Sequence, residues 1–111
     1  MIIFKEGVRM SNLQPQAVVA ICAAYSIYQD FGHRDMTVTS CNDSRHSATS
    51  LHYSGNAFDL RTHNTGEGER LANQIRLALP ALDFDVIFEG EATENEHIHI
   101  EHQPRGGALN G

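Results

Sequence analysis

The run His-Ile-His-Ile-Glu at positions 97–101 strongly limits how this chain can fold. Successive side chains of a β-strand point to opposite faces, so the two isoleucines share one face and His97, His99 and Glu101 share the other. The isoleucines require an apolar layer on their side. Burying three ionisable groups on the other side is costly unless they are paired or bind a metal ion. The sequence therefore predicts a strand with one packed face and one face that is either an exposed polar stripe or a binding site.

Two segments have the apolar spacing of helices. The first covers residues 17–28, with Pro15 in its first turn and Gly32 after its end. Its apolar residues extend so far around the helix that we expect it to be largely buried. The second helix covers residues 67–79 and is stopped by Pro80.

Three further segments have the β-branched, alternating composition of strands, namely residues 36–41, 56–62 and 84–88. Residues 1–4 form a short strand or an arm. The last two strands are joined by a short turn, which favours antiparallel pairing. We therefore expect an α+β fold, in which helices cover one face of a small, mostly antiparallel sheet. Asp59 alternates with Phe58 and Leu60, so its side chain should point away from the apolar core.

Length and charge narrow the class of protein. The 111 residues are expected to form one domain, 1–111, with the Gly/Pro-rich residues 103–111 as a flexible tail. The net charge is −6 and no Lys/Arg stripe is present, which argues against binding nucleic acid or anionic membranes. No apolar run reaches roughly 18 residues, so membrane insertion is not expected. Polar residues interrupt the N-terminal apolar run, and we expect a monomer without a signal peptide, synthesised in the cytoplasm.

The two cysteines, Cys22 and Cys41, do not form a CxxC pair, so a cysteine-based zinc site is not expected. Cys22 falls in the first helical pattern and Cys41 at the end of a strand. Both are expected to be buried free thiols, and the sequence does not imply a disulfide between them.

His52 and Asp59 form a first chemical motif. They are seven residues apart, from a loop and the strand that follows it, and Gly55 permits a tight backbone path between them. Their side chains can therefore converge on one point. With a histidine from the run 97–101 they make two imidazoles and one carboxylate, a zinc-binding set that leaves a fourth position for water. A carboxylate near such a site can activate the water as a nucleophile.

The second motif offers two pairs of ligand and base. Glu96 precedes His99 by three residues, and Glu94 precedes His97 by the same spacing. Either glutamate could serve as general base beside a metal-ligating histidine. Glu101 could fix the tautomer of a ligating imidazole. The spacing alone leaves both pairs open.

The run Ser50-x-His52-x-x-Gly55-x-Ala57-x-Asp59 resembles the SxHxxGxAxD signature of the M15-type zinc D-alanyl-D-alanine peptidases, a group that includes phage L-alanyl-D-glutamate endopeptidases. All five fixed positions of the signature are present. The resemblance extends over about residues 36–102 and implies a hedgehog/DD-peptidase-like fold. It also implies one Zn²⁺ per chain.

The family's second element is an acid three residues before the third zinc ligand, and related proteins carry HxH with the second histidine on zinc. Both patterns select His99 as the ligand and Glu96 as the base. By this resemblance, Glu96 takes a proton from the attacking water and returns it to the leaving amine, and His97 orients the reacting carbonyl oxygen. Arg45 is the candidate for the family's oxyanion-stabilising arginine, although its spacing is shorter than usual. The implied zinc ligands are His52, Asp59 and His99.

The resemblance implies a zinc metallopeptidase that hydrolyses an amide bond involving a D-amino acid in the stem peptides of peptidoglycan. Such a hydrolase would act in cell-wall degradation as a carboxypeptidase or as an endopeptidase of the endolysin type. The small chain is similar to phage-encoded lysins that are released to the cell wall. Its acidic charge argues against a lysin, because wall polymers are anionic.

The main alternative is a non-catalytic, zinc-containing binding or structural module of the same fold. Glu96 favours the enzyme, because a structural zinc site closes its fourth position with a protein ligand, which His97 or His102 could supply. A cupin-like site built on HxH is disfavoured. Cupins place their glutamate later than Glu101 and need more strands.

Overall fold

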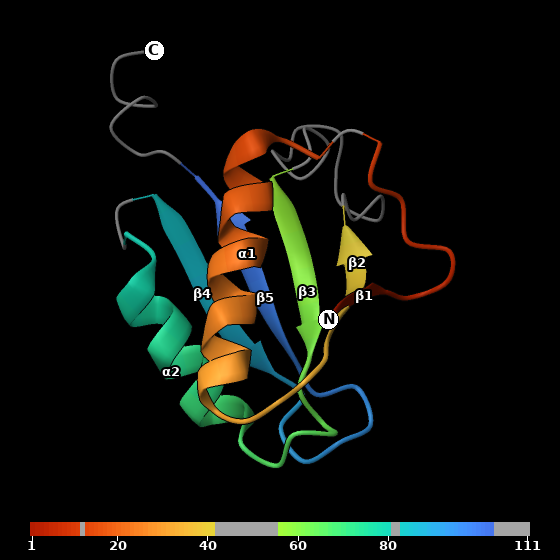
Figure 1. The fold of residues 1–111 in the computed structure, drawn as a ribbon, viewed down its shortest axis with the longest axis vertical. Helices are drawn as coiled ribbons and strands as arrows, with labels where there is room; N and C mark the ends of the chain where they lie inside the picture. The colour runs from red at the N-terminus through yellow and green to blue at the C-terminus, as the bar shows by residue number, and fades with distance from the viewer. Residues whose placement is uncertain (12, 42–55, 81–82, 104–111) are drawn as a thin grey trace.

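The structure, a computed structural model, describes residues 1–11, 13–41, 56–80 and 83–103 (Figure 1). Each predicted helix and strand is present, with ends shifted by a few residues. No helix in this part of the chain is long and apolar enough to cross a membrane. The elements are β1 (Ile2–Phe4), α1 (Pro15–Asp30), β2 (Met36–Cys41), β3 (Ala57–Arg61), α2 (Gly68–Ala78), β4 (Phe84–Glu89) and β5 (His97–His102).

The strands form one sheet in the order β1-β2-β3-β5-β4. The pairs β2–β3, β3–β5 and β4–β5 are antiparallel, whereas β1 lies parallel to β2, with Ile2 opposite Met36 and Phe4 opposite Val38. The sheet is therefore mixed, and our expectation of a mostly antiparallel sheet was wrong. The reason is that residues 1–4 form an edge strand, and α1 carries the chain back so that β2 runs in the same direction.

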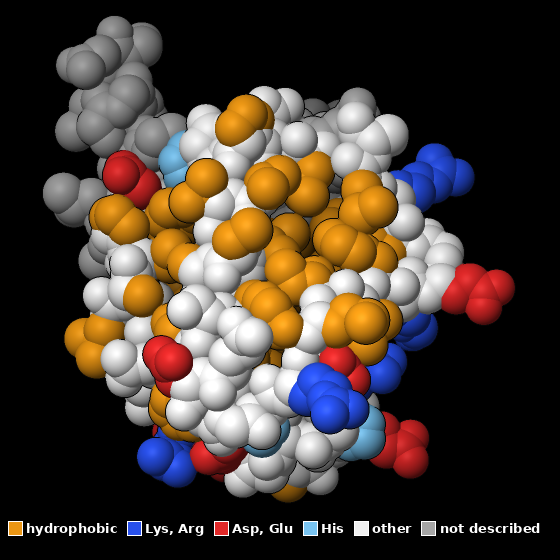
Figure 2. All heavy atoms as spheres, in the orientation of Figure 1, with side chains coloured by type: hydrophobic (Ala, Val, Ile, Leu, Met, Phe, Trp, Pro, Cys, Tyr) orange, Lys and Arg blue, Asp and Glu red, His pale blue; other side chains and the backbone are white. Residues whose placement is uncertain are grey.

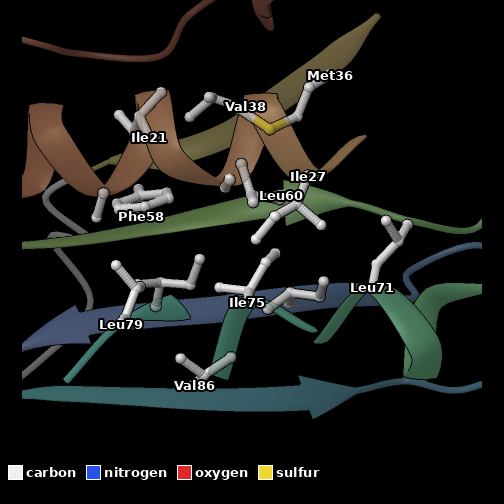
Figure 3. Packing of buried hydrophobic residues seen from close by; sticks show 14 of the residues in the cluster. Ile21, Ile27, Met36, Val38, Phe58, Leu60, Leu71, Ile75, Leu79 and Val86 are labelled. Atoms are coloured by element: carbon white, nitrogen blue, oxygen red, sulfur yellow. The ribbon is translucent and has the colours of Figure 1, made fainter. Parts of the chain in front are cut away.

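Both helices pack on one face of the sheet, as expected (Figure 1). Phe58 and Leu60 of β3 and Ile98 and Ile100 of β5 point toward them and are almost completely buried. Burial of each large apolar side chain contributes about 1.5–3 kcal/mol, so the alternation of β5 determines which of its faces meets the helices. Figure 3 shows this core, to which the helices contribute Ile21, Ile27, Leu71 and Ile75.

The first helix is less buried than its composition predicts. Val18 and Val19 are 44% and 67% exposed, and Cys22 is exposed as well. Figure 2 shows hydrophobic side chains gathered over α1 on this face of the molecule. The helix meets the sheet through a stripe that includes three alanines, which allow close approach, and the opposite side faces outward. The buried stripe is Ala17, Ala20, Ile21, Ala24, Ile27 and Tyr28.

The two cysteines are both free, as expected, but only Cys41 is buried. Burial, and secondarily the negative charge of Asp59, raise the pKa of the Cys41 thiol to about 11. Cys41 is therefore a protonated core residue at neutral pH. The expectation that Cys22 is buried was wrong, because it lies on the outward side of α1.

Candidate metal centre

The face of the sheet that points away from the helices, called here the open face, carries the polar residues of β3 and β5. These strands are antiparallel neighbours, so residues of one lie directly opposite residues of the other. Because side chains alternate along a strand, the neighbours of the buried Phe58 and Ile98 must point to the open face. The opposed pairs there are Asp59–His99, Arg61–His97 and Ala57–Glu101.

Asp59 and His99 meet on the open face. The Asp59 Oδ1 atom lies 2.7 Å from His99 Nδ1, and the two side chains are only 16% and 15% exposed. Glu101 Oε1 lies 3.1 Å from the other ring nitrogen, Nε2. The imidazole is therefore held between two carboxylates, and the orientation of its ring is defined from both sides.

The protonation of His99 follows from this environment. Burial by itself lowers the pKa of the imidazole, but hydrogen bonds and charges of Asp59 and Glu101 outweigh it and raise the pKa to about 9. Both ring nitrogens then carry protons that they donate to the carboxylates. Without a metal ion, His99 is an imidazolium at neutral pH.

The Asp59–His99 pair is chemically compatible with zinc coordination. A metal ligand must present a deprotonated nitrogen, and a zinc-ligating histidine commonly donates its other N–H to a carboxylate. Glu101 accepts that second bond at Nε2, which leaves Nδ1 for the metal beside Asp59 Oδ1. An imidazole nitrogen and a carboxylate oxygen are both donor atoms that zinc prefers.

The third expected ligand, His52, and the expected oxyanion arginine, Arg45, lie outside the described residues. Within the described ranges, no three metal-binding side chains cluster at one point. The structure therefore brings together two of the three expected ligands, Asp59 and His99, with Glu101 behind them.

Glu96 does not lie with this pair. Its Oε2 accepts a hydrogen bond from Thr62 Oγ1 at 2.7 Å, and its Oε1 accepts one from the Ala92 N–H at 3.0 Å. Thr62 is fully buried and its N–H donates to the Glu96 carbonyl oxygen at 3.3 Å, which extends the ladder between β3 and β5. Glu96 and His99 are three positions apart along extended backbone, an odd offset, so their side chains lie on opposite faces. The carboxylate of Glu96 is on the helix side, away from Asp59.

His97 lies on the open face of β5, two residues before His99. Its Nδ1 is 2.7 Å from the carbonyl oxygen of Asn95, and its Nε2 is 3.1 Å from Glu89 Oε1. Both contacts are to hydrogen-bond acceptors, so the ring is held from two sides and its tautomer decides which nitrogen donates. The sequence analysis did not assign roles to Glu89 or to Arg61, which stands opposite His97. The alternation of Arg61 with Asp59 along one strand would have identified it.

No protein-family model matches the chain, and no curated protein is similar to it. The assignment of the site thus depends on the geometry of the described residues and on the motif that surrounds His52 and Asp59.

Proposed function

We propose that this chain is a zinc-dependent peptidase with a hedgehog/DD-peptidase-like fold that hydrolyses an amide bond in the stem peptides of peptidoglycan, next to a D-amino acid. The observation that best supports it is the contact of Asp59 with His99 on neighbouring strands, on the face that carries no helix. Asp59 belongs to the signature that resembles the M15-type peptidases, and His99 belongs to the second element of that resemblance. Zinc bound there would activate water and polarise the scissile carbonyl.

The chain's own residues have separate tasks in this proposal. Asp59 and His99 hold the ion, with His52 as third ligand. Glu101 keeps the proton on Nε2 of His99 and so presents Nδ1 to the metal. His97 lies at the next outward-facing position of β5, and to orient the carbonyl oxygen of the substrate its ring would have to release Glu89.

The transfer of a proton from water needs a carboxylate on the same face as the metal. The resemblance assigns this task to Glu96, which would have to leave Thr62 and turn around the end of the strand to perform it. Glu89 already lies on the open face, bound to His97. Glu96→Gln and Glu89→Gln separate the two assignments. The variant that removes the base should lose about 100-fold or more in turnover while it keeps its zinc.

The decisive experiment is digestion of purified peptidoglycan by the zinc-loaded protein, with mass analysis of the released peptides. We expect new termini within or at the end of the stem peptide, and no products after removal of zinc with a chelator. Full activity in Glu96→Gln would remove Glu96 from the mechanism. Absence of any cleavage by the zinc-loaded protein would reject the peptidase.

The second candidate is a zinc-containing binding module without turnover. It is favoured by the position of the Glu96 carboxylate on the helix side, where it is bound to Thr62. His102 does not supply a fourth ligand, because it alternates with Glu101 onto the other face and packs on the ring of Phe84 at 4.9 Å. In the digestion experiment this module would bind peptidoglycan in a zinc-dependent manner and release no peptide.

A further inference from the structure

The strand β4 forms one edge of the sheet, and within the described residues only β5 pairs with it (Figure 1). An edge strand presents a row of backbone N–H and C=O groups to which another strand can bind. The side chains of β4 favour such pairing, because Phe84, Val86 and Phe88 form an apolar row on the helix side. Ile87, on the open face, is 47% exposed. An incoming strand would therefore find an apolar edge.

The backbone hydrogen bonds show which groups of β4 point outward. The Gln103 N–H donates to the Asp83 carbonyl oxygen at 2.6 Å, so Asp83 faces β5. In an antiparallel ladder, the backbone groups of successive residues point to alternate edges of the strand. Every second residue after Asp83 therefore faces β5 as well. Val86 and Phe88, at the positions between, turn their N–H and C=O groups away from the sheet.

Arg76, in the last turn of α2, blocks the middle of this outer edge. Its Nη2 and Nε atoms donate to the Val86 carbonyl oxygen at 2.9 and 3.3 Å. Its Nη1 atom donates to Asn73 Oδ1 at 2.7 Å, which fixes the orientation of the guanidinium. A charged, planar donor group therefore stands where the N–H of an added strand would have to arrive.

Two copies of β4 can pair around a two-fold axis, and the acidic residues of the strand limit the register. An axis at Asp85 would place the two Asp85 side chains opposite each other, and an axis at Ile87 would place Asp85 opposite Glu89. Like charges directly opposite each other destabilise a sheet. An axis at Val86 instead places Asp85 of one copy opposite Ile87 of the other, and no acid faces an acid within residues 84–88.

The Val86 carbonyl oxygen is the central acceptor of this favoured register. Residues that face each other in a hydrogen-bonded pair exchange both of their N–H···O bonds, so each Val86 would donate to the other. Arg76 occupies this acceptor in each copy. The two-fold axis would also bring both guanidiniums to the same place. Pairing would therefore require both copies to break their Arg76 bonds and to move two cations away.

We propose that Arg76 blocks strand addition to β4 by a second copy of this chain and so keeps the protein monomeric. Hydrogen bonds from a charged donor are stronger than those between neutral groups, so the guanidinium is not easily displaced. Arg76 reaches this edge from the helix layer, whereas Asp59 and His99 lie on the open face. The role of Arg76 therefore does not depend on whether the chain is a peptidase.

The test compares the oligomeric state of the full chain and of Arg76→Met over a wide range of concentrations, by analytical ultracentrifugation. The parent should remain monomeric. Arg76→Met should dimerise, with an association constant larger by about 10- to 100-fold, which corresponds to the strength of a hydrogen bond to a charged group. Arg70→Met is the matched control. It removes the same charge from the same helix, where the guanidinium binds Glu67 at 2.9 Å, and it should stay monomeric.

Amide hydrogen exchange identifies the surface that pairs. In Arg76→Met, exchange of the Val86 and Phe88 N–H groups should slow as the protein concentration rises, because both groups point outward in the monomer and donate across the axis in the dimer. In Arg70→Met, the same two amides should exchange at a rate that does not depend on concentration.

Charges at position 87 test the register. In the Arg76→Met background, Ile87→Glu places an acid opposite Asp85 and should abolish the dimer. Ile87→Lys places a cation there and should strengthen it. The corresponding changes at Gln74, an exposed residue of α2, control for the net charge and should have little effect.

Three results would overturn the inference. These are an Arg76→Met protein that stays monomeric, a dimer in which exchange at Val86 and Phe88 does not slow, and a parent that already dimerises through β4. If Arg76→Met does not fold, Arg76→Lys carries the comparison. It keeps the charge but loses the planar fork, and it should dimerise more strongly than the parent.

Discussion

Gly68, the first residue of α2, should not tolerate a side chain. A Cβ atom added there would lie 2.5 Å from Glu96 Oε2, 2.6 Å from Phe88 Cε1 and 2.9 Å from Thr62 Oγ1. All three separations are shorter than van der Waals contact. Helix propensity alone predicts the opposite, because alanine is more favourable than glycine in a helix by about 1 kcal/mol. The substitution Gly68→Ala therefore sets local propensity against packing.

The packing effect should be larger. Glu96 and Phe88 can each move, but a shift of the Glu96 carboxylate gives up its hydrogen bond from the fully buried Thr62 hydroxyl. Overpacking of a filled site costs about 1–3 kcal/mol. The lost hydrogen bond adds about 1 kcal/mol and the propensity gain removes about 1 kcal/mol. Gly68→Ala should therefore lower the free energy of unfolding by about 1–3 kcal/mol, which corresponds to a fall in Tm of roughly 4–15 °C.

Urea and thermal unfolding followed by circular dichroism would measure this change. Gln74→Ala, an exposed position of the same helix, is the matched control and should stay within about 0.5 kcal/mol of the parent. In a double-mutant cycle, Glu96→Ala should reduce the cost of Gly68→Ala, because one of the three obstructing atoms is gone. A Gly68→Ala protein as stable as the parent, or more stable, would refute the packing of Glu96 against α2.

Further measurements address the metal centre and the cysteines. The purified protein should hold about one zinc per chain, and His52→Ala or Asp59→Ala should remove it; stoichiometric metal in both variants, measured by atomic emission, would contradict the ligand assignment. Zinc affinity should increase by up to about tenfold per pH unit from pH 6.5 toward 9, because zinc must displace the proton that His99, with its pKa of about 9, retains over this range. A zinc affinity independent of pH would contradict the Asp59–His99 contact. In the metal-free protein the proton on His99 contributes stability, which is complete below pH 6.5 and is lost as the pH rises through about 9. Iodoacetamide should alkylate Cys22 in the folded protein and leave Cys41 unmodified until the protein unfolds, as peptide mass analysis would reveal.

Much of the fold was predictable because its signals are local. The alternation at 97–101 identified β5 and both of its faces. Apolar spacing identified the two helices, with Pro15 at the start of the first and Pro80 after the end of the second. The parallel addition of β1 was not predictable, since a three-residue strand carries little pattern and its partner is set by how α1 crosses the sheet. The exposure of Val19 and Cys22 was missed for a related reason: an apolar residue on a helix does not reveal how many sides of that helix will be covered.

The candidate site, like the fold, was predictable only in part. The strand pattern predicted that Asp59 points away from the core, and the structure has it opposite His99. The same alternation along the strand places Glu96 on the helix side. This was missed because the resemblance to the family assigned Glu96 as the base beside His99. Arg61 was not assigned a role, although its alternation with Asp59 along β3 places both side chains on the same face.

By itself, the sequence determined which side chains of β3 and β5 lie on the open face. Alternation in an extended chain assigns each side chain to one side of the sheet, whatever packs nearby. Only the tertiary structure decided which strands became neighbours, and so which side chains meet: Asp59 with His99, and Glu96 with Thr62. Those contacts join residues far apart in sequence. They depend on how both helices bury the opposite face of the sheet, which is a property of the whole core and not of any one segment.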